Sequence, residues 1–185
     1  MNRTLFSLCI ALFACGGVAA QATSNVITAI EFYDATVDQY FITANIDEVS
    51  MLDNGTDWVR TGYSFNVVDP SAIAVAGANP VCRLYGNTPD GQYLHFFSAS
   101  PEECAYAVAN APDVWIVESD NAFGAFLADA ATGACPDGTV PLYRSFGPHT
   151  DHRYTIDFNV QAAMLEQGWI AEGYGDPPVA MCLPQ

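Results

Sequence analysis

Two histidines and two arginines occupy matching places along the chain, and these side chains are the best suited to polar chemistry. His95 and His152 each open a short aromatic segment, and Arg83 and Arg144 lie in the segment before each of them. Asp151 directly precedes His152. Such groups beside aromatic rings could face a ligand, so the predicted binding residues are Arg83, His95, Arg144, Asp151 and His152. The alternative is a hydrogen-bonded imidazole at a strand end, with no ligand.

Catalytic chemistry leaves little trace in the sequence. The chain has no Gly-x-Ser-x-Gly elbow, no His-Glu-x-x-His pair and no phosphate-binding loop. Four carboxylates at Asp47, Glu48, Asp53 and Asp57 could gather calcium, but they lack EF-hand spacing and suit a solvated acidic surface better. No catalytic residue, metal or cofactor is expected.

Cysteines suggest a covalent framework. Four follow the N-terminal segment, and an even number in an exported chain favours disulfides. Alignment within the chain favours Cys82 with Cys104 and Cys135 with Cys182. A zinc site is the alternative, although no Cys-x-x-Cys spacing exists.

The elements that must position these residues recur three times, in units covering about residues 27–68, 81–127 and 140–183. Each unit has two aromatic segments, the second ending in a hydroxyl residue, then a helix N-cap residue and a tryptophan. The second segments begin at Tyr40, His95 and His152; the cap residues are Asn45, Ser100 and Asp157; the tryptophans are Trp58, Trp115 and Trp169. Tyr40 retains the size and polar tip of histidine, which favours the structural alternative for the imidazoles.

This pattern predicts a β-β-α-β order in each unit. Small units that cannot bury their apolar faces alone pack against one another. We therefore expect an α+β, β-rich domain of three β-β-α-β repeats, closed with pseudo-threefold symmetry in a trefoil-like manner. A glutamate three residues after Asn45 and Ser100 predicts capping boxes.

The repetition of the tryptophans at the same internal position in all three units favours a core role over sugar stacking. The turns between the paired strands differ in length, as exposed turns do. Their polar residues are better candidates for ligand contact: Asp38, Gln92, Tyr93, His149 and Asp151.

Composition indicates an exported protein. Residues 1–22 have the charged start, apolar stretch and small-residue cleavage sites of a signal peptide, leaving 23–185 as one domain. A lipoprotein signal at Cys15 is the alternative. The net charge of −16 argues against nucleic-acid binding, and no later segment reads as a membrane span. We expect a secreted or periplasmic monomer.

The clearest motif combines Tyr143-Arg144-Ser145-Phe146, Asp151-His152-Arg153-Tyr154-Thr155 and Trp169-Ile170-Ala171-Glu172-Gly173. It resembles a repeat of unknown function in secreted and surface proteins of bacteria, often appended to cell-wall hydrolases. Unit 1 departs from the motif, with Glu31 for the arginine and Tyr40 for the histidine. The resemblance implies an extracellular module that associates with glycan or the cell envelope. Three functions stay open: a noncatalytic binding module, a structural or protein-interaction domain, and a carboxylate-dependent hydrolase.

Overall fold

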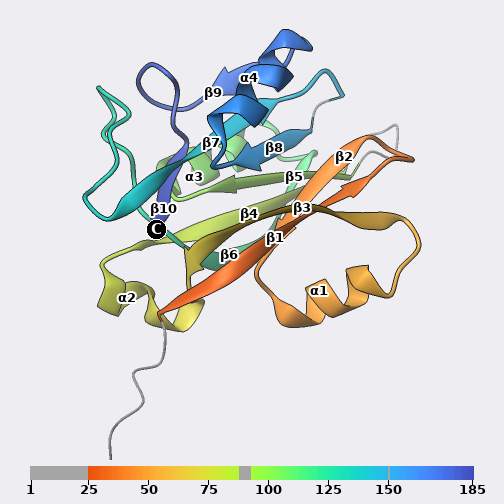
Figure 1. Cartoon of the computed structure of the whole chain (residues 1–185), viewed down its shortest axis with the longest axis horizontal. Coiled ribbons are helices and arrows are strands. Elements are labelled where there is room, and N and C mark those ends of the chain that lie inside the picture. The colour runs from red at the N-terminus through yellow and green to blue at the C-terminus, as the bar shows by residue number, and fades with distance from the viewer. Residues whose placement is uncertain (1–24, 88–92, 150) are drawn as a thin grey trace, which may run out of the picture.

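The structure is a computed structural model that describes residues 25–87, 93–149 and 151–185. The predicted signal peptide therefore lies outside the described residues, as does Gln92. The fold is β-rich, with two antiparallel sheets and short helices, so the predicted α+β, β-rich class is confirmed at that level (Figure 1). Within the described residues no helix is long and apolar enough to cross a bilayer.

Each unit contains its elements in the predicted order, and its first strand pairs with the other two. Unit 1 comprises β1 (Val26–Asp34), β2 (Gln39–Thr43), α1 (Ile46–Asp53) and β3 (Trp58–Val68). Unit 2 comprises β4 (Asn79–Asn87), β5 (Tyr93–Ser98), α3 (Pro101–Asn110) and β6 (Trp115–Ala125). Unit 3 comprises β7 (Thr139–Phe146), β8 (His152–Thr155), α4 (Phe158–Glu166) and β9 (Ile170–Glu172), followed by β10 (Met181–Pro184).

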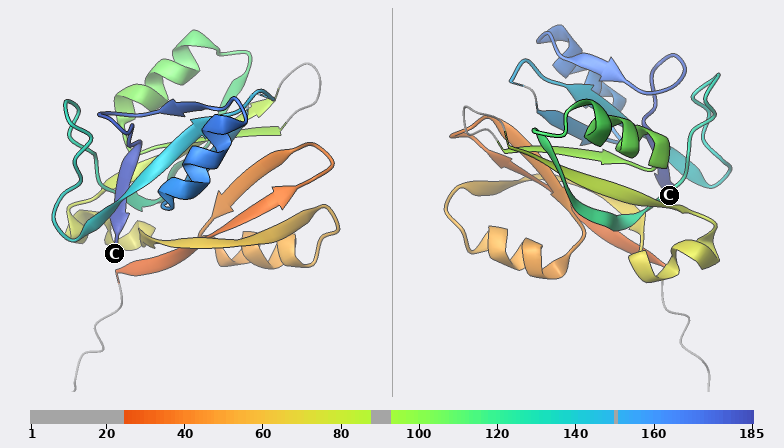
Figure 2. Two further views of the ribbon diagram at one scale, coloured as in Figure 1. Left: turned by 45° about the horizontal axis from the view of Figure 1, so that its top comes forward. Right: turned by 180° about the vertical axis from the view of Figure 1, so that it is seen from behind.

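The sheets do not divide the chain into three equal parts. Units 1 and 2 share a six-stranded sheet in the order β2-β1-β3-β6-β4-β5, whereas β7, β8, β9 and β10 form a separate four-stranded sheet. Figure 2 shows this second sheet and α4 lying over one face of the first. The second strands β2, β5 and β8 nevertheless contact one another in every combination. Threefold symmetry is not shown by this sheet division.

In units 1 and 2 the pairing of the third strand with the first is interrupted in the same region of the strands, although not at the same residue. Pairing of β3 with β1 shifts between Ile30 and Phe32, and pairing of β6 with β4 shifts between Val81 and Arg83. In unit 3 the corresponding stretch is a loop, because β9 pairs with the end of β7 and β10 with its beginning. Bulges bend a strand and redirect its side chains. The interruptions therefore lie beside the predicted arginine positions.

The helices begin where the sequence predicts, but the predicted capping boxes do not form. Asn45, Ser100 and Asp157 each accept a hydrogen bond from a backbone N–H in the first helical turn. The N–H of each cap residue donates to the hydroxyl that ends the preceding strand: Thr43, Ser98 and Thr155. Because that hydroxyl takes the bond, Glu48 and Glu103 can bind elsewhere.

One main core joins all three units. Phe32, Phe97, Phe123, Leu142 and Met181 are almost completely buried within it. Both predicted disulfides are present: Cys82–Cys104 ties β4 to α3, and Cys135–Cys182 ties the loop before β7 to β10. Between units 1 and 2 the chain forms the 3-10 helix η1 (Pro70–Ala72) and the helix α2 (Ile73–Ala76). The proline at the first position of η1 suits a helix start.

Candidate functional site

Arg83 links unit 2 to unit 1. Its terminal nitrogens donate to both carboxylate oxygens of Glu48 at 2.8 and 2.9 Å, and its Nε lies 2.8 Å from Glu118. Its guanidinium also lies 5.5 Å from the ring centre of Phe41. Burial alone would raise the pKa of Glu48, but hydrogen bonds from Arg83 and Thr43 outweigh it and lower that pKa. The pair therefore stays ionised.

Arg144 links unit 3 to unit 2 through the same set of contacts. It donates to Glu103 at 2.6 and 3.3 Å, its Nε lies 2.8 Å from Glu172, and it lies 4.7 Å from the Phe96 ring centre. Its side chain is 5% exposed, so solvent hardly reaches the predicted binding group. Burial opposes ionisation of Glu103, and the bond from Arg144 prevails, lowering the pKa of Glu103.

The contact between units 3 and 1 has the charges reversed. Unit 1 carries Glu31 at the arginine position, and Arg153 of unit 3 donates to both of its oxygens at 2.9 and 3.0 Å. Arg153 also lies 4.2 Å from the ring centre of Tyr40. Arg–carboxylate pairs of this two-bond geometry are directional and strong. Each pair of units is thus joined by one arginine, one or more glutamates and an aromatic ring.

The two histidines are packed within these contacts. His95 lies 4.5 Å from Phe41 and His152 lies 5.3 Å from Phe96, ring centre to ring centre. Burial and the charge of Arg83 lower the pKa of His95 to about 3. Burial, with Arg144 adding to it, also lowers the pKa of His152 despite Glu172. Both imidazoles are therefore neutral near pH 7.

Asp151 is buried, with 1% of its surface exposed. One carboxylate oxygen accepts the Tyr40 backbone N–H at 2.6 Å, while Oδ1 has no hydrogen-bond partner among the described residues. Burial raises the pKa of Asp151 to about 8, against the lowering effect of its backbone hydrogen bonds. Asp151 therefore attaches the turn before β8 to β2 and is shielded from solvent.

Accessible polar and aromatic groups gather instead where the β1–β2 turn meets the turn before β8. Tyr33 lies 4.7 Å from Tyr40, and Tyr40 lies 6.1 Å from Trp169, ring centre to ring centre. These three half-buried rings, with Asp38 and His149 at their edge, are here named the aromatic ledge. It combines residues from units 1 and 3.

Polar contacts order the ledge. The Tyr33 hydroxyl donates to Asp38 at 2.7 Å, and this bond, aided by burial, raises the pKa of Tyr33 to about 12. His149 Nε2 lies 3.8 Å from the other Asp38 oxygen. Trp169 lies over Gly147, where an added Cβ would be 2.7 Å from the indole. A larger residue at 147 would displace that ring.

The remaining tryptophans are not fully in the core. Trp58 and Trp115 are half-buried, like Trp169, and lie 5.9 and 6.0 Å from Phe41 and Phe96 respectively. Sequence reasoning missed Arg153 and the glutamates that the three interface arginines contact: Glu31, Glu48, Glu103, Glu118 and Glu172. Glu118 and Glu172 each stand three residues after a tryptophan, which was the available signal. Among the described residues no cluster suited to a metal ion occurs.

Comparison with known proteins gives one match. Residues 28–175 match a domain of unknown function, DUF5648. The chain belongs to the DUF5648 family. This agrees with the resemblance to a family of unknown function, and the match covers β1 through the turn after β9. No curated protein and no solved structure matches the chain.

Proposed function

We propose that this DUF5648 protein is a noncatalytic binding module of the cell exterior whose aromatic ledge binds glycan. The observation that carries the proposal is the placement of three half-buried rings beside an exposed carboxylate and imidazole. Aromatic faces pack against the apolar faces of sugar rings, and a few polar groups then fix orientation. Asp38 and His149, both in the variable turns, supply those groups.

The electrostatics favour a neutral glycan. The chain carries 21 acidic residues against 5 basic ones, and Arg153, the cation nearest the ledge, is paired with Glu31. A polymer rich in phosphate or carboxylate would be repelled. Uncharged hydroxyls can donate to Asp38 without that cost. We therefore expect neutral oligosaccharides, such as those built from N-acetylhexosamines, to bind best.

The ledge is pre-organised by the contact between units 3 and 1. Arg153 packs on Tyr40, Asp151 accepts the Tyr40 backbone N–H, and Gly147 leaves room for Trp169. Groups held before binding cost less entropy on association. Two further inferences accompany the proposal. The three inter-unit arginine contacts support a closed arrangement of the units with pseudo-threefold symmetry. The two disulfides support a location outside the cytoplasm.

The test is a glycan array, followed by titration calorimetry with an N-acetylglucosamine tetramer. Trp169→Ala and Asp38→Asn are expected to weaken binding by tenfold or more. Trp58→Ala is the matched control, because Trp58 is half-buried against an aromatic ring in the same way but lies outside the ledge. No binding to any glycan, or equal losses from both tryptophan variants, would reject the ledge as a glycan site.

A further inference from the structure

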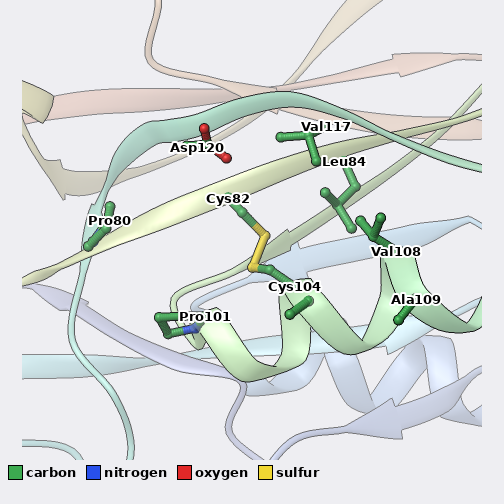
Figure 3. Close-up of a pocket in the computed structure, with 10 residues that line it drawn as sticks. Pro80, Cys82, Leu84, Pro101, Cys104, Val108, Ala109, Val117 and Asp120 are labelled. Carbon is green, nitrogen blue, oxygen red and sulfur yellow. A yellow bond between two sulfur atoms is a disulfide. The ribbon is translucent and has the colours of Figure 1, made fainter. Parts of the chain in front are cut away.

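A pocket lies in unit 2, between α3 and strands β4 and β6. Its volume is about 550 Å³, within the range of small-molecule sites. Leu84, Val108 and Val117 supply apolar walls, and the Cys82–Cys104 disulfide crosses from strand to helix (Figure 3). We name this the α3 pocket. It is independent of the aromatic ledge and of the function proposed for it.

The α3 pocket exists because α3 packs less closely than the other two helices. α1 buries Val49 and Leu52, and α4 buries Gln161 and Met164, whereas α3 buries no residue fully. Cys104, aligned with Val49, is joined to Cys82 across a Cα–Cα distance of 6.5 Å. The covalent bridge retains the helix while leaving apolar surface uncovered. Exposed apolar surface favours an apolar occupant.

Of the described residues that line the α3 pocket, one, Asp120, carries a charge. Asp120 stands at the interruption of β6, where Ser119 pairs with Arg83 and the next paired residue is Phe123. Figure 3 shows it on β6, on the far side of β4 from the helix. No hydrogen bond or ion pair holds its carboxylate among the described residues. None of the described residues that line the pocket is basic.

We propose that the α3 pocket binds a small amphiphile with an apolar body and a cationic head. The apolar walls would take the body, and the Asp120 carboxylate would face the head. Charge complementarity decides against fatty acids, since both Asp120 and the net charge of −16 repel an anionic head. A cationic head is attracted both by the Asp120 carboxylate and by the negative net charge of the protein.

The experiment titrates n-octylammonium, 1-octanol and octanoate into the disulfide-bonded protein and follows backbone amide shifts by two-dimensional NMR. Shifts are expected at Leu84, Val108 and Ala109, with octylammonium binding threefold to fivefold more tightly than octanol, the value of one exposed ion pair. Octanoate should bind most weakly. Asp120→Asn should abolish the preference for octylammonium over octanol.

Two controls make the outcome decisive. Asp137→Asn removes an exposed carboxylate that does not line the pocket, and it should leave the preference unchanged. Ala105→Phe should fill the pocket and eliminate binding of all three compounds; Ala109→Phe replaces it if the first variant does not fold. The proposal fails if octanoate binds as tightly as octylammonium, or if the shifts lie elsewhere. It also fails if sedimentation shows a dimer that buries α3, since a second copy would then be the occupant.

Discussion

The contact between units 3 and 1 offers a sharp test of how the domain is held closed. Glu31 is completely buried, and the Arg153 side chain is 11% exposed. Substituting Arg153 by methionine keeps the apolar stem but leaves the Glu31 carboxylate without its counter-charge. Breaking a buried pair from one side typically costs about 3–5 kcal/mol of unfolding free energy. We expect a loss in that range, lowered somewhat by the remaining exposure of Arg153.

The chain supplies a matched control for geometry. Arg60 and Asp53 also form a two-bond pair, with still shorter distances of 2.6 and 2.7 Å, but their side chains are 47% and 38% exposed. An exposed pair contributes little to stability, because water screens the two charges and holding two long side chains in one geometry costs entropy. Arg60→Met should therefore cost much less than Arg153→Met. The double variant Glu31→Gln with Arg153→Met should recover part of the loss, because it removes the unpaired charge.

The assay is equilibrium urea unfolding at pH 7 with both disulfides intact, followed by tryptophan fluorescence and far-UV circular dichroism. Coincident transitions would justify a two-state treatment. If Arg153→Met and Arg60→Met destabilise equally, burial does not decide the strength of these pairs. Closure of the domain through the buried Arg153–Glu31 pair would then be refuted.

Three further outcomes are expected. Because burial lowers the pKa values of His95 and His152, the unfolded chain binds more protons than the folded one below a pH of about 6.5. The free energy of unfolding should therefore decrease as the pH falls. The variant His95→Phe should show a smaller decrease, measured by urea unfolding at a series of pH values. Asp151 has the opposite effect on the pH dependence of stability. Because its pKa is raised to about 8 in the folded state, the free energy of unfolding should decrease as the pH rises from about 4 to 8. The variant Asp151→Asn should lose this decrease but keep the decrease at low pH that the histidines cause. Replacing Cys82 and Cys104 together by alanine should cost about 3 kcal/mol for a loop spanning 22 residues, measured by thermal unfolding; a loss below about 1 kcal/mol would contradict the chain-entropy account.

Local features of the fold could be predicted from the sequence because they depend on neighbours in the chain. Cap residues such as Ser100 act on N–H groups two or three positions away, and β-branched and aromatic runs mark strands. The division into a six-stranded and a four-stranded sheet could not be predicted. The division depends on whether the third strand of one unit pairs with the third strand of another. Units 1 and 2 are joined in one sheet by the single β3–β6 pair Val68–Gly124, which no sequence pattern marks.

The candidate site was predictable only in part, for a related reason. Variable turn length indicated exposed contacts, and the structure brings Asp38 and His149 together at the ledge. Asp151 belongs to the same turn yet is buried, because its carboxylate reaches the backbone of Tyr40 in another unit. The sequence pattern within one unit does not show which turn residues will be buried by contact with another unit. The same limit hid the inter-unit role of Glu48, which sequence alone assigned to helix capping.

The departures of unit 1 have a physical account. In the other two interfaces an arginine at the first-strand position binds a helix glutamate and packs on a phenylalanine of the preceding unit. At the third interface the first-strand residue is Glu31, and the phenylalanine position of unit 3 holds Arg153. The helix position that would supply a glutamate is Val160, so an arginine at 31 would lack its partner. In the third interface the glutamate thus lies on the first strand, at Glu31, and the arginine lies on the facing unit, at Arg153. The two opposite charges still neutralise each other, with their positions exchanged. Tyr40, rather than histidine, then provides the ring on which Arg153 packs and leaves a second side for the ledge.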